Sequence, residues 1–249
     1  MKNLFLDIGN TSINYAFTHG RRIISRGKIA TSQYGQIFSV IEKYYPHNII
    51  IASVVPEVES RILKTNLRQR QIFKIGKDIP VTVKNKYLKP HTVGIDRLLN
   101  AYYIKEKKFF PAICIDMGSA ITIDIISSRG EFCGGLIFPG VELCYQVLGE
   151  KTSLLPALKP KKLTAKIYGQ STEECIHLGI INGISNLLNG VIENVSKQLK
   201  NKWKKPLSVF ITGGNISFFI STIKKNKWKI IPDMTLESMM LLWTKYCKK

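Results

Sequence analysis

The sequence predicts an α/β fold in which one domain occurs twice, with mixed sheets flanked by helices and a cleft between the two copies. The main observation is an internal repeat: LFLDIGNTSINYAF begins at Leu4, and ICIDMGSAITIDII begins at Ile113. Both segments read as an apolar strand, an aspartate, a glycine turn and an alternating second strand. Asp7 and Asp116 lie about half the chain length apart. We therefore expect an N-terminal domain over 1–111 and a C-terminal domain over 112–249.

Strand and helix signals alternate along the first half, as this fold class requires. Strands are predicted at LFLDIG, INYAFTH and RIISRGKIA, with Gly20 and Gly27 marking turns. A helix is predicted over 34–45, and the apolar run 48–56 reads as a central strand. The remaining elements are a helix over 57–70, strands at QIFKIG and PVTVKN, and a helix over VGIDRLLNAYYIKE.

The same alternation restarts at Ala112. Two strands are predicted within AICIDMGSAITIDII, and helices are predicted over 141–148, 171–200 and 236–246. SVFITGGN reads as a buried strand that runs into a Gly-Gly turn. The TGGN segment is a candidate contact for the base and ribose of a nucleotide.

The composition is that of an ordinary globular protein, with 45% hydrophobic and 22% charged residues. We find no apolar run near the ~18 residues that a membrane span needs, and Asp7 interrupts the N-terminal apolar run. We therefore expect a cytoplasmic protein without a membrane partner. The 5 cysteines lack CxxC spacing, and the 4 histidines do not cluster with them. Reduced, mostly buried thiols are expected rather than a zinc site or a disulfide framework.

The net charge of +20 has two interpretations. A nucleic-acid or other anionic partner is one, and a lysine-rich solvated surface is the other. The lysine clusters, such as KEKK at 105–108 and KNKWKK at 200–205, fall between apolar segments, and no nucleic-acid-binding motif organises them. This dispersion favours the second interpretation, and nucleic acid is not expected as a partner.

The paired hairpins suggest nucleotide binding. A glycine turn directs successive backbone N–H groups outward and can bind a phosphate, and nearby hydroxyl groups add donors. A carboxylate beside the turn repels phosphate but can hold the cation that accompanies it. The alternative is that Asp7 and Asp116 only cap their own turns. Their occurrence in matched contexts favours the nucleotide interpretation.

A third acidic residue, Asp96, is placed at the start of a helix in the segment GIDR. It could satisfy backbone N–H groups and the helix dipole at this position. In a catalytic role, Asp96 could accept the proton of a hydroxyl group that attacks a γ-phosphoryl group. Arg97 could bind a carboxylate or phosphate.

Taken in order, several segments resemble the motifs of type III pantothenate kinases. They are DIGNT (7–11), Tyr87 with KPHTVGIDR (89–97), IDMGSAITID (115–124), GEFCGGLIFPG (130–140), TSLLP (152–156), GQSTEECIHLG (169–179) and ITGGN (211–215). The resemblance covers almost the whole chain. It implies the fold of the actin-like, acetate and sugar kinase superfamily, with two ribonuclease-H-like (actin-like ATPase) domains.

The resemblance also implies an activity, its cofactors and its partners. The activity is the ATP-dependent phosphorylation of the primary hydroxyl of pantothenate to 4'-phosphopantothenate, the first step of coenzyme A biosynthesis. The implied cofactors are ATP with Mg²⁺ and a monovalent cation, K⁺ or NH₄⁺. The implied small-molecule partners are pantothenate and ATP, and the implied assembly is a homodimer.

Site residues follow from the resemblance by position. The ATP- and phosphate-binding residues are Asp7, Ile8, Gly9, Asn10, Thr11, Ser12, Ile13 and Asn14, with Ser119 where a threonine is usual. Asp116 matches the ligand of the monovalent cation. The substrate-binding residues are Tyr87, Gly94, Ile95, Asp96, Arg97 and Thr172, and Asp96 is the catalytic base.

The chain departs from the usual motif at two positions of the KPHTVGIDR segment. Lys89 stands where asparagine is common. Ile95 stands beside Asp96 where a small residue is common, so its larger side chain could alter the packing of the base. Two other functions stay open: a transcriptional accessory or nucleic-acid-binding protein on the kinase fold, and a kinase for another small substrate. The intact GIDR segment argues against the first, since a binding protein does not need a placed base.

Overall fold

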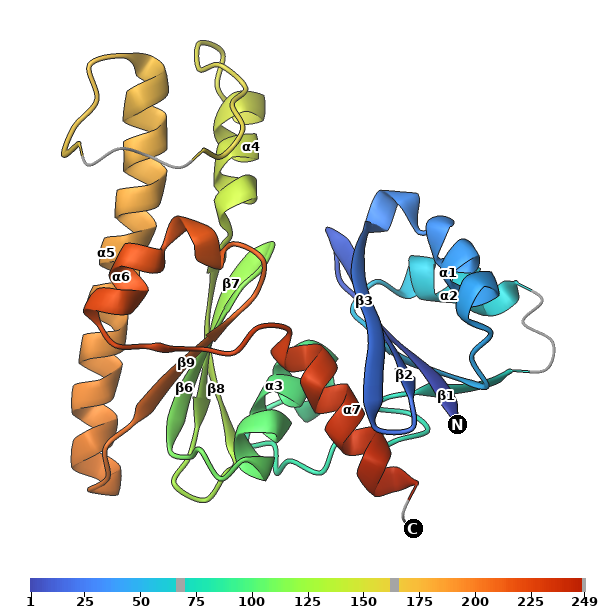
Figure 1. Cartoon of the computed structure of the whole chain (residues 1–249). Helices are drawn as coiled ribbons and strands as arrows, with labels where there is room; N and C mark the ends of the chain where they lie inside the picture. Colours follow the sequence, from blue (N-terminus) through green and yellow to red (C-terminus); the bar gives the residue numbers. More distant parts are fainter. Residues whose placement is uncertain (66–69, 162–165, 248–249) are drawn as a thin grey trace. The chain divides into compact units, whose positions relative to one another are not determined.

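The computed structural model describes residues 1–65, 70–161 and 166–247, and the chain forms two compact units (Figure 1). Unit 1 comprises Met1–Lys107 with Asp233–Lys249, and unit 2 comprises Lys108–Pro232. The chain passes from unit 1 to unit 2 after Lys107, close to the expected boundary at residue 111. Unit 2 is shorter than the expected C-terminal domain 112–249, because the C-terminal helix packs in unit 1.

Unit 1 contains a five-stranded mixed sheet of order β3-β2-β1-β4-β5. Its two central strands, β1 and β4, are parallel, and nearly all of their residues are buried. Buried parallel strands read as continuous apolar runs, which explains LFL and III in the sequence. The strands are β1 (Lys2–Ile8), β2 (Ser12–His19), β3 (Arg22–Ala30), β4 (Asn48–Ser53) and β5 (Gln71–Lys74).

Helices cover both faces of this sheet. Leu4, Leu6 and Ile8 point to a core completed by two helices, whereas Phe5 belongs to the core on the opposite face. This is the two-residue alternation of a strand. The first face is covered by α1 (Gln36–Tyr44) and α2 (Pro56–Lys64), and the second by α3 (Ile95–Glu106) and α7 (Met234–Tyr246).

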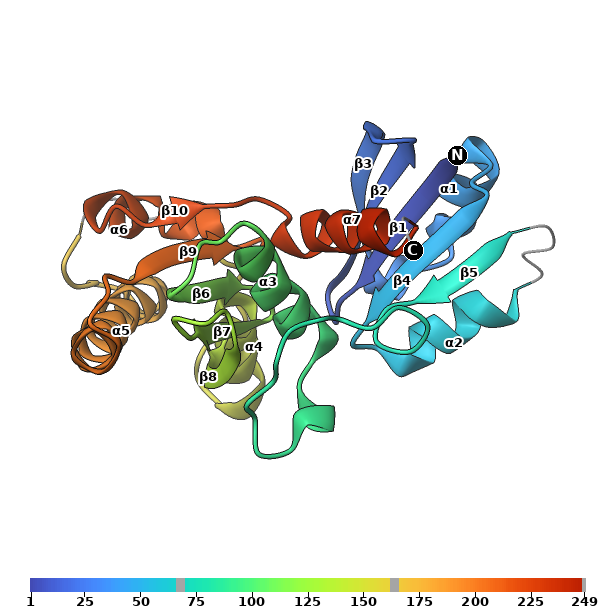
Figure 2. The ribbon, with the colours of Figure 1, turned by 90° about the horizontal axis from the view of Figure 1, so that it is seen from below.

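Buried polar contacts bind the helix α7 to unit 1. Ser238 Oγ donates to the Leu99 carbonyl oxygen, and Thr235 Oγ1 donates to Asn100 Oδ1, both in buried surroundings. At the helix start, Arg26 of β3 forms ion pairs with Asp233 and Glu237. Figure 2 shows α7 crossing the sheet over β1 and β2. These contacts join residues more than a hundred positions apart, which no local pattern predicts.

Unit 2 repeats the architecture of unit 1. Its sheet, read from the opposite edge, has the order β8-β7-β6-β9-β10. As in unit 1, two successive antiparallel pairs are followed by a parallel pair at the centre. The predicted duplicated α/β fold with two mixed sheets is therefore confirmed. The strands are β6 (Ala112–Met117), β7 (Ala120–Ile126), β8 (Phe132–Pro139), β9 (Ser208–Thr212) and β10 (Lys229–Ile230).

One face of this second sheet packs against helices. Ile113, Ile115 and Met117 of β6 contribute to a single apolar core with the helices of unit 2. The helices are α4 (Val141–Lys151), α5 (Thr172–Trp203) and α6 (Ile220–Lys225). Short 3-10 helices occur at Thr31–Gln33, Pro90–Thr92 and Ile216–Phe218.

A buried hydrogen bond joins α4 to α5. The hydroxyl of Tyr145 lies 2.6 Å from Nδ1 of His177, and both side chains are almost fully buried. Burial raises the pKa of Tyr145 to about 12 and lowers the pKa of His177, so both groups are neutral near pH 7. The pair therefore satisfies two polar groups inside the unit without burying a charge.

Two expected local features are wrong. Gly27 does not mark a turn: it lies within β3 opposite Tyr15, and a Cβ atom there would come within 2.4 Å of the Tyr15 ring. PVTVKN is not a strand, although Val81 and Val83 pack on the core of unit 1. Pro80 lacks the N–H group that a sheet ladder needs. The predicted helix 57–70 ends at Lys64, and 66–69 lie outside the described residues.

Two expectations about composition also need correction. The helix α5 contains an 18-residue window with a mean hydropathy of 1.4, so an apolar run of membrane-spanning length does occur. Its buried residues, such as Ile181 and Leu188, pack in the core of unit 2, as a core helix does. The 5 cysteines are free, but only Cys114 is fully buried, so the expected burial of most thiols is wrong.

We predict that Leu188→Ala lowers the free energy of unfolding by about 2–5 kcal/mol, because Leu188 is 0% exposed in the core between α5 and the sheet. Urea unfolding followed by circular dichroism measures the change. Leu154→Ala in the same unit is the control, since Leu154 is 93% exposed and should cost little. Equal effects of the two substitutions would contradict the assignment of α5 as a core helix.

Candidate active site

The turn between β1 and β2 is narrow. The Gly9 N–H group donates to the Ser12 carbonyl oxygen at 3.0 Å, which closes the turn over Asn10 and Thr11. A Cβ atom on Gly9 would lie 3.1 Å from that same oxygen. This contact is tighter than most Cβ contacts, so a glycine suits the position. Asn10 and Thr11 are exposed at the tip.

Thr31 holds this turn from the end of β3. Its hydroxyl group donates to the Gly9 carbonyl oxygen at 2.7 Å, and its N–H group donates to the Thr11 carbonyl oxygen at 3.0 Å. Two carbonyl oxygens of the turn are thus engaged by Thr31. Since carbonyl oxygens repel an anion, this arrangement suits a turn that receives a phosphate through its N–H groups.

Asp7 lies at the end of β1, on the sheet face that carries Phe5 and the helices α3 and α7. Its register partner on β2 is Asn14, whose side-chain amide donates to Asp7 Oδ2 at 3.4 Å. The carboxylate is partly buried. Ile8 and Ile13, by contrast, belong to the core on the opposite face, so their side chains serve packing and only their backbone borders the turn.

Asp96 lies in the first turn of α3, as predicted. Its Oδ1 atom accepts a hydrogen bond from the Arg97 N–H group at 2.8 Å. Burial raises the pKa of the Asp96 carboxyl group, while the Arg97 bond and charge act in the opposite direction. A partly desolvated carboxylate with a raised pKa is a better proton acceptor than an exposed one.

Gly94 provides the space that Asp96 occupies. A Cβ atom on Gly94 would lie 2.4 Å from Asp96 Oδ1 and 3.8 Å from Val54 Cγ1. Its backbone angles, φ −56 and ψ 139, are open to any residue, so the requirement for glycine is steric. The absence of a side chain here fixes the position of the carboxylate.

Val54 connects Asp96 to the hairpin turn within unit 1. The Val54 N–H group donates to the Ile8 carbonyl oxygen at 3.0 Å, directly after Asp7. The same residue is the nearest apolar neighbour of the Gly94 position. The structure therefore brings the start of α3 and the end of β1 together at one point, although they are separated by most of unit 1 in sequence.

Ile95, the unusual neighbour of the base, packs into the core of unit 1. A Cβ atom on Gly76 would lie 3.1 Å from Ile95 Cδ1, and Gly76 has a φ of +92. Gly76 thus makes room for the isoleucine, whose side chain is used in packing. The larger side chain of Ile95 is therefore accommodated in the core of unit 1, and only its backbone borders Asp96.

The segment before α3 is ordered by local bonds. Asn85 Oδ1 accepts from the Tyr87 N–H group at 3.0 Å, and Asn85 Nδ2 donates to the Pro90 carbonyl oxygen at 3.2 Å. Thr92 Oγ1 donates to the Lys89 carbonyl oxygen at 2.8 Å. Tyr87 is 37% exposed, and Arg97 is buried. Tyr87 and the GIDR segment are thus joined by one short loop of unit 1.

In the second hairpin, as in the first, other segments donate hydrogen bonds to the carbonyl oxygens of the turn. Asp116 is the penultimate residue of β6, and the carbonyl oxygens of Met117, Gly118 and Ser119 all accept hydrogen bonds. Asn215 donates to the first two, from its N–H group at 3.0 Å and its side-chain amide at 3.4 Å. The Gly140 N–H group donates to the Ser119 carbonyl oxygen at 2.9 Å.

Gly213 allows the close approach of this loop to Asp116. A Cβ atom on Gly213 would lie 2.6 Å from Asp116 Oδ1, and its φ of +103 disfavours any other residue. Thr212 is the register partner of Asp116 across β6 and β9. The TGGN segment is thus packed directly behind the carboxylate of the second hairpin, a contact that the sequence alone did not indicate.

Thr172 is the first residue of α5 and is exposed. Ser171 caps this helix by accepting from the Glu174 N–H group at 3.2 Å, and Glu174 Oε2 accepts from the Gln170 N–H group at 3.0 Å. These bonds fix the start of the helix and hence the place of Thr172 in unit 2.

Each unit therefore gathers its own share of the predicted site residues. Unit 1 contains the 7–14 hairpin, the Tyr87 loop and the GIDR segment, and unit 2 contains Asp116, Ser119 and Thr172. Two supporting residues were missed, Thr31 and Val54, because neither carries a local signal. Asn215 belongs to the TGGN segment that the sequence indicated as a nucleotide contact, but its bonds to the turn after Asp116 were not expected.

Comparison with known proteins identifies the fold. The neighbours in fold include a ROK family glucokinase from Streptomyces griseus in complex with glucose and AMPPNP (TM-score 0.53, 11% identity, 97% of this chain and 99% of that one). Another is a candidate Baf family transcriptional activator from Campylobacter jejuni (TM-score 0.65, 19% identity, 99% and 100%). At such identities the likeness shows the fold alone: an actin-like ATPase and sugar kinase fold.

The sequence comparisons are more specific. The profile of the type III pantothenate kinase family matches residues 3–194. A type III pantothenate kinase of Persephonella marina is 32% identical over 226 residues, which cover 85% of this chain and 87% of the relative. The fold is that of the actin-like ATPases and sugar kinases, and the matched family is one of kinases. The chain belongs to the type III pantothenate kinase family.

We predict that Gly94→Ala lowers kcat at least tenfold, because the new methyl group displaces the Asp96 carboxylate, and misplacement by about 1 Å can cost ~10²-fold. Steady-state kinetics with saturating substrates measures the change. Gly35→Ala is the control in the same unit, since no atom lies within 4 Å of a Cβ at Gly35. An unchanged kcat in Gly94→Ala, with the fold retained, would show that this steric contact does not position the carboxylate.

Proposed function

We propose that this protein transfers the γ-phosphoryl group of ATP to the primary hydroxyl group of pantothenate, the first step of coenzyme A biosynthesis. Membership of the family supports the activity and the substrate. The structural observation that carries the proposal is the proximity of two groups in unit 1. Val54 joins the glycine turn after Asp7 to the start of α3, where Asp96 lies. In this proposal the turn that binds phosphate and the base are thus joined through Val54 within unit 1.

In this proposal the segment Asp7 to Asn14 and Ser119 bind the phosphates of ATP. Thr31 engages the carbonyl oxygens of the first turn, and Asn215 with Gly140 engages those of the second. The backbone N–H groups and the hydroxyl groups are the parts of each turn suited to phosphate oxygens.

Asp96 acts as the base that accepts the proton of the pantothenate hydroxyl group. Phosphoryl transfer depends chiefly on alignment, so the fixed position of the carboxylate matters more than its basicity. Arg97 binds the carboxylate of pantothenate, to which a guanidinium group is well suited. Tyr87, Gly94, the backbone of Ile95 and Thr172 complete the substrate contacts.

The residues present fit the expected cations. Asp7 and Asp116 are carboxylates at strand ends, and hard cations such as Mg²⁺ and K⁺ take oxygen ligands. Asp7 would hold Mg²⁺ near the phosphates, and Asp116 would hold the monovalent cation, K⁺ or NH₄⁺. Bound Mg²⁺ would supply neutralisation of phosphate charge. Gly213 keeps side-chain atoms away from Asp116 Oδ1, where a Cβ would come within 2.6 Å.

The test of the proposed function is a coupled assay of ADP formation with pantothenate, acetate and simple sugars, each measured with sodium and with potassium. Turnover should require pantothenate and rise with potassium. Activity only with another small alcohol or acid would replace pantothenate as the substrate. Absence of any turnover, together with sequence-specific and salt-sensitive DNA binding, would favour a transcriptional accessory protein.

The pH dependence of kcat tests the role of Asp96. The deprotonated form is required, and burial raises the pKa of this carboxyl group above its usual value. We predict that kcat falls on the acid side with a midpoint above ~3.9, the pKa of an ordinary aspartate. Asp96→Asn should lower kcat by roughly 10²–10⁴-fold with the fold retained. Near-full activity in this variant would exclude Asp96 as the base.

We further propose that the protein is a cytoplasmic homodimer that uses an apolar face of unit 2. Leu143 and Val147 lie one turn apart on α4 and are 41% and 46% exposed. Large apolar side chains gathered on one surface commonly mark a protein interface.

If this surface forms the dimer, Leu143→Glu combined with Val147→Glu should convert the dimer to a monomer, because charged groups cannot be buried unpaired at an interface. Light scattering after size-exclusion chromatography measures the mass. Ile24→Lys is the control, since Ile24 is 49% exposed on β3 of unit 1. A dimer that persists in the double variant would rule out this face.

A further inference from the structure

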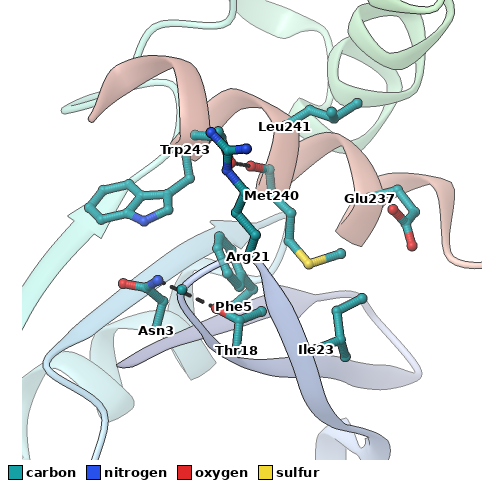
Figure 3. Close-up of a pocket in the computed structure, with 11 residues that line it drawn as sticks. Asn3, Phe5, Thr18, Arg21, Ile23, Glu237, Met240, Leu241 and Trp243 are labelled. Carbon is teal, nitrogen blue, oxygen red and sulfur yellow. Dashed lines mark hydrogen bonds between the residues drawn. The ribbon is translucent and has the colours of Figure 1, made fainter. Parts of the chain in front are cut away.

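Unit 1 contains a cavity that the proposed activity does not use. It has a volume of about 430 Å³ and lies between α7 and the β1–β2–β3 part of the sheet (Figure 3). Its walls include Phe5 of β1 and Met240 and Trp243 of α7. Cavities of ~300–1,000 Å³ are typical of small-molecule sites.

The cavity lies at the opposite end of the strands from the hairpin turn. Asn3 and its register partner Thr18 line it, whereas Asp7 is four residues further along β1. At ~3.3 Å per residue, the two positions are roughly 13 Å apart. None of the residues that line the cavity is among those proposed to bind ATP and pantothenate.

Two buried polar side chains lie in the cavity wall. Asn3 is 5% exposed and Thr18 is 3% exposed. Asn48 Nδ2 donates to Asn3 Oδ1 at 2.8 Å, and Asn3 Nδ2 donates to Thr18 Oγ1 at 3.4 Å. The Thr18 hydroxyl oxygen is thus an acceptor, and within the described ranges no acceptor is found for its own proton. The wall offers a hydrogen-bond donor.

A positive charge lies at the same cavity. Arg21 follows the turn at Gly20, and its side chain extends toward α7 in Figure 3. No ion pair of Arg21 occurs among the residues that the structure describes. Glu237 also lines the cavity, but its carboxylate is paired with Arg26 of β3. The unpaired charge of the lining is therefore positive.

We propose that this cavity binds a small amphipathic anion, a carboxylate with a short apolar body. The carboxylate lies against Arg21, and the apolar body lies against Phe5, Met240 and Trp243. A neutral apolar molecule would gain nothing from the charge of Arg21, and a cation would be repelled by it. The ligand contacts both α7 and the sheet, so its binding stabilises unit 1 against unfolding.

Octanoate and octylammonium are matched probes, because they share an apolar body and carry opposite charges. Each is titrated into the full chain by calorimetry at about 150 mM salt, where surface charges are screened beyond ~8 Å. Octanoate should bind at one site per chain and raise the unfolding temperature, and octylammonium should not bind. Arg21→Gln should weaken octanoate binding about tenfold, the usual effect of losing a charged hydrogen bond.

Arg22→Gln is the matched control. Arg22 is the adjacent exposed residue, does not line the cavity, and its loss changes the net charge by the same amount. It should leave octanoate affinity unchanged, and both variants should keep the unfolding temperature of the ligand-free protein. Equal weakening by the two variants would show general attraction to a basic surface and overturn the proposal. Equal binding of octylammonium, or no octanoate binding at millimolar concentrations, would also overturn it.

Discussion

The candidate site depends on one constraint that both units share. A central, mostly buried strand carries an aspartate as its penultimate residue, and carbonyl oxygens of the following turn are bound by another segment. Thr31 does this for the turn after Asp7, and Asn215 with Gly140 does it for the turn after Asp116. The buried strand fixes where the carboxylate lies, and the bound carbonyl groups fix how the turn faces a ligand. Neither turn could hold this geometry alone.

Two glycines leave the room in which Asp96 and its neighbour Ile95 are packed. Gly94 leaves the space that the Asp96 carboxylate occupies, and Gly76 leaves the space that the Ile95 side chain occupies. Asp96 is therefore held by close packing and by one backbone bond to Arg97, with no long side chain to orient it. Such packing costs little entropy at the moment of reaction, since the group is already in place.

The C-terminal helix completes unit 1 after the chain has passed through unit 2. It closes the core over Phe5 and Ala52 and ties to α3 through Ser238 and Thr235. The helix therefore supports the element that carries Asp96. It also forms one wall of the proposed anion cavity, so the same helix contributes to stability and to the proposed second binding site.

The sequence by itself determined the duplication, the two aspartate hairpins and the start of the helix at Asp96, because each is encoded by neighbouring residues with a clear period or turn signal. The tertiary structure decided the rest. The placement of Thr31 on the turn, of Val54 between Asp7 and Asp96, and of α7 in unit 1 arises from contacts between distant segments. Gly27 reads as a turn by local rules, yet it faces the Tyr15 ring within a strand. Local periodicity reports which face of an element is buried, but it does not report which element covers that face.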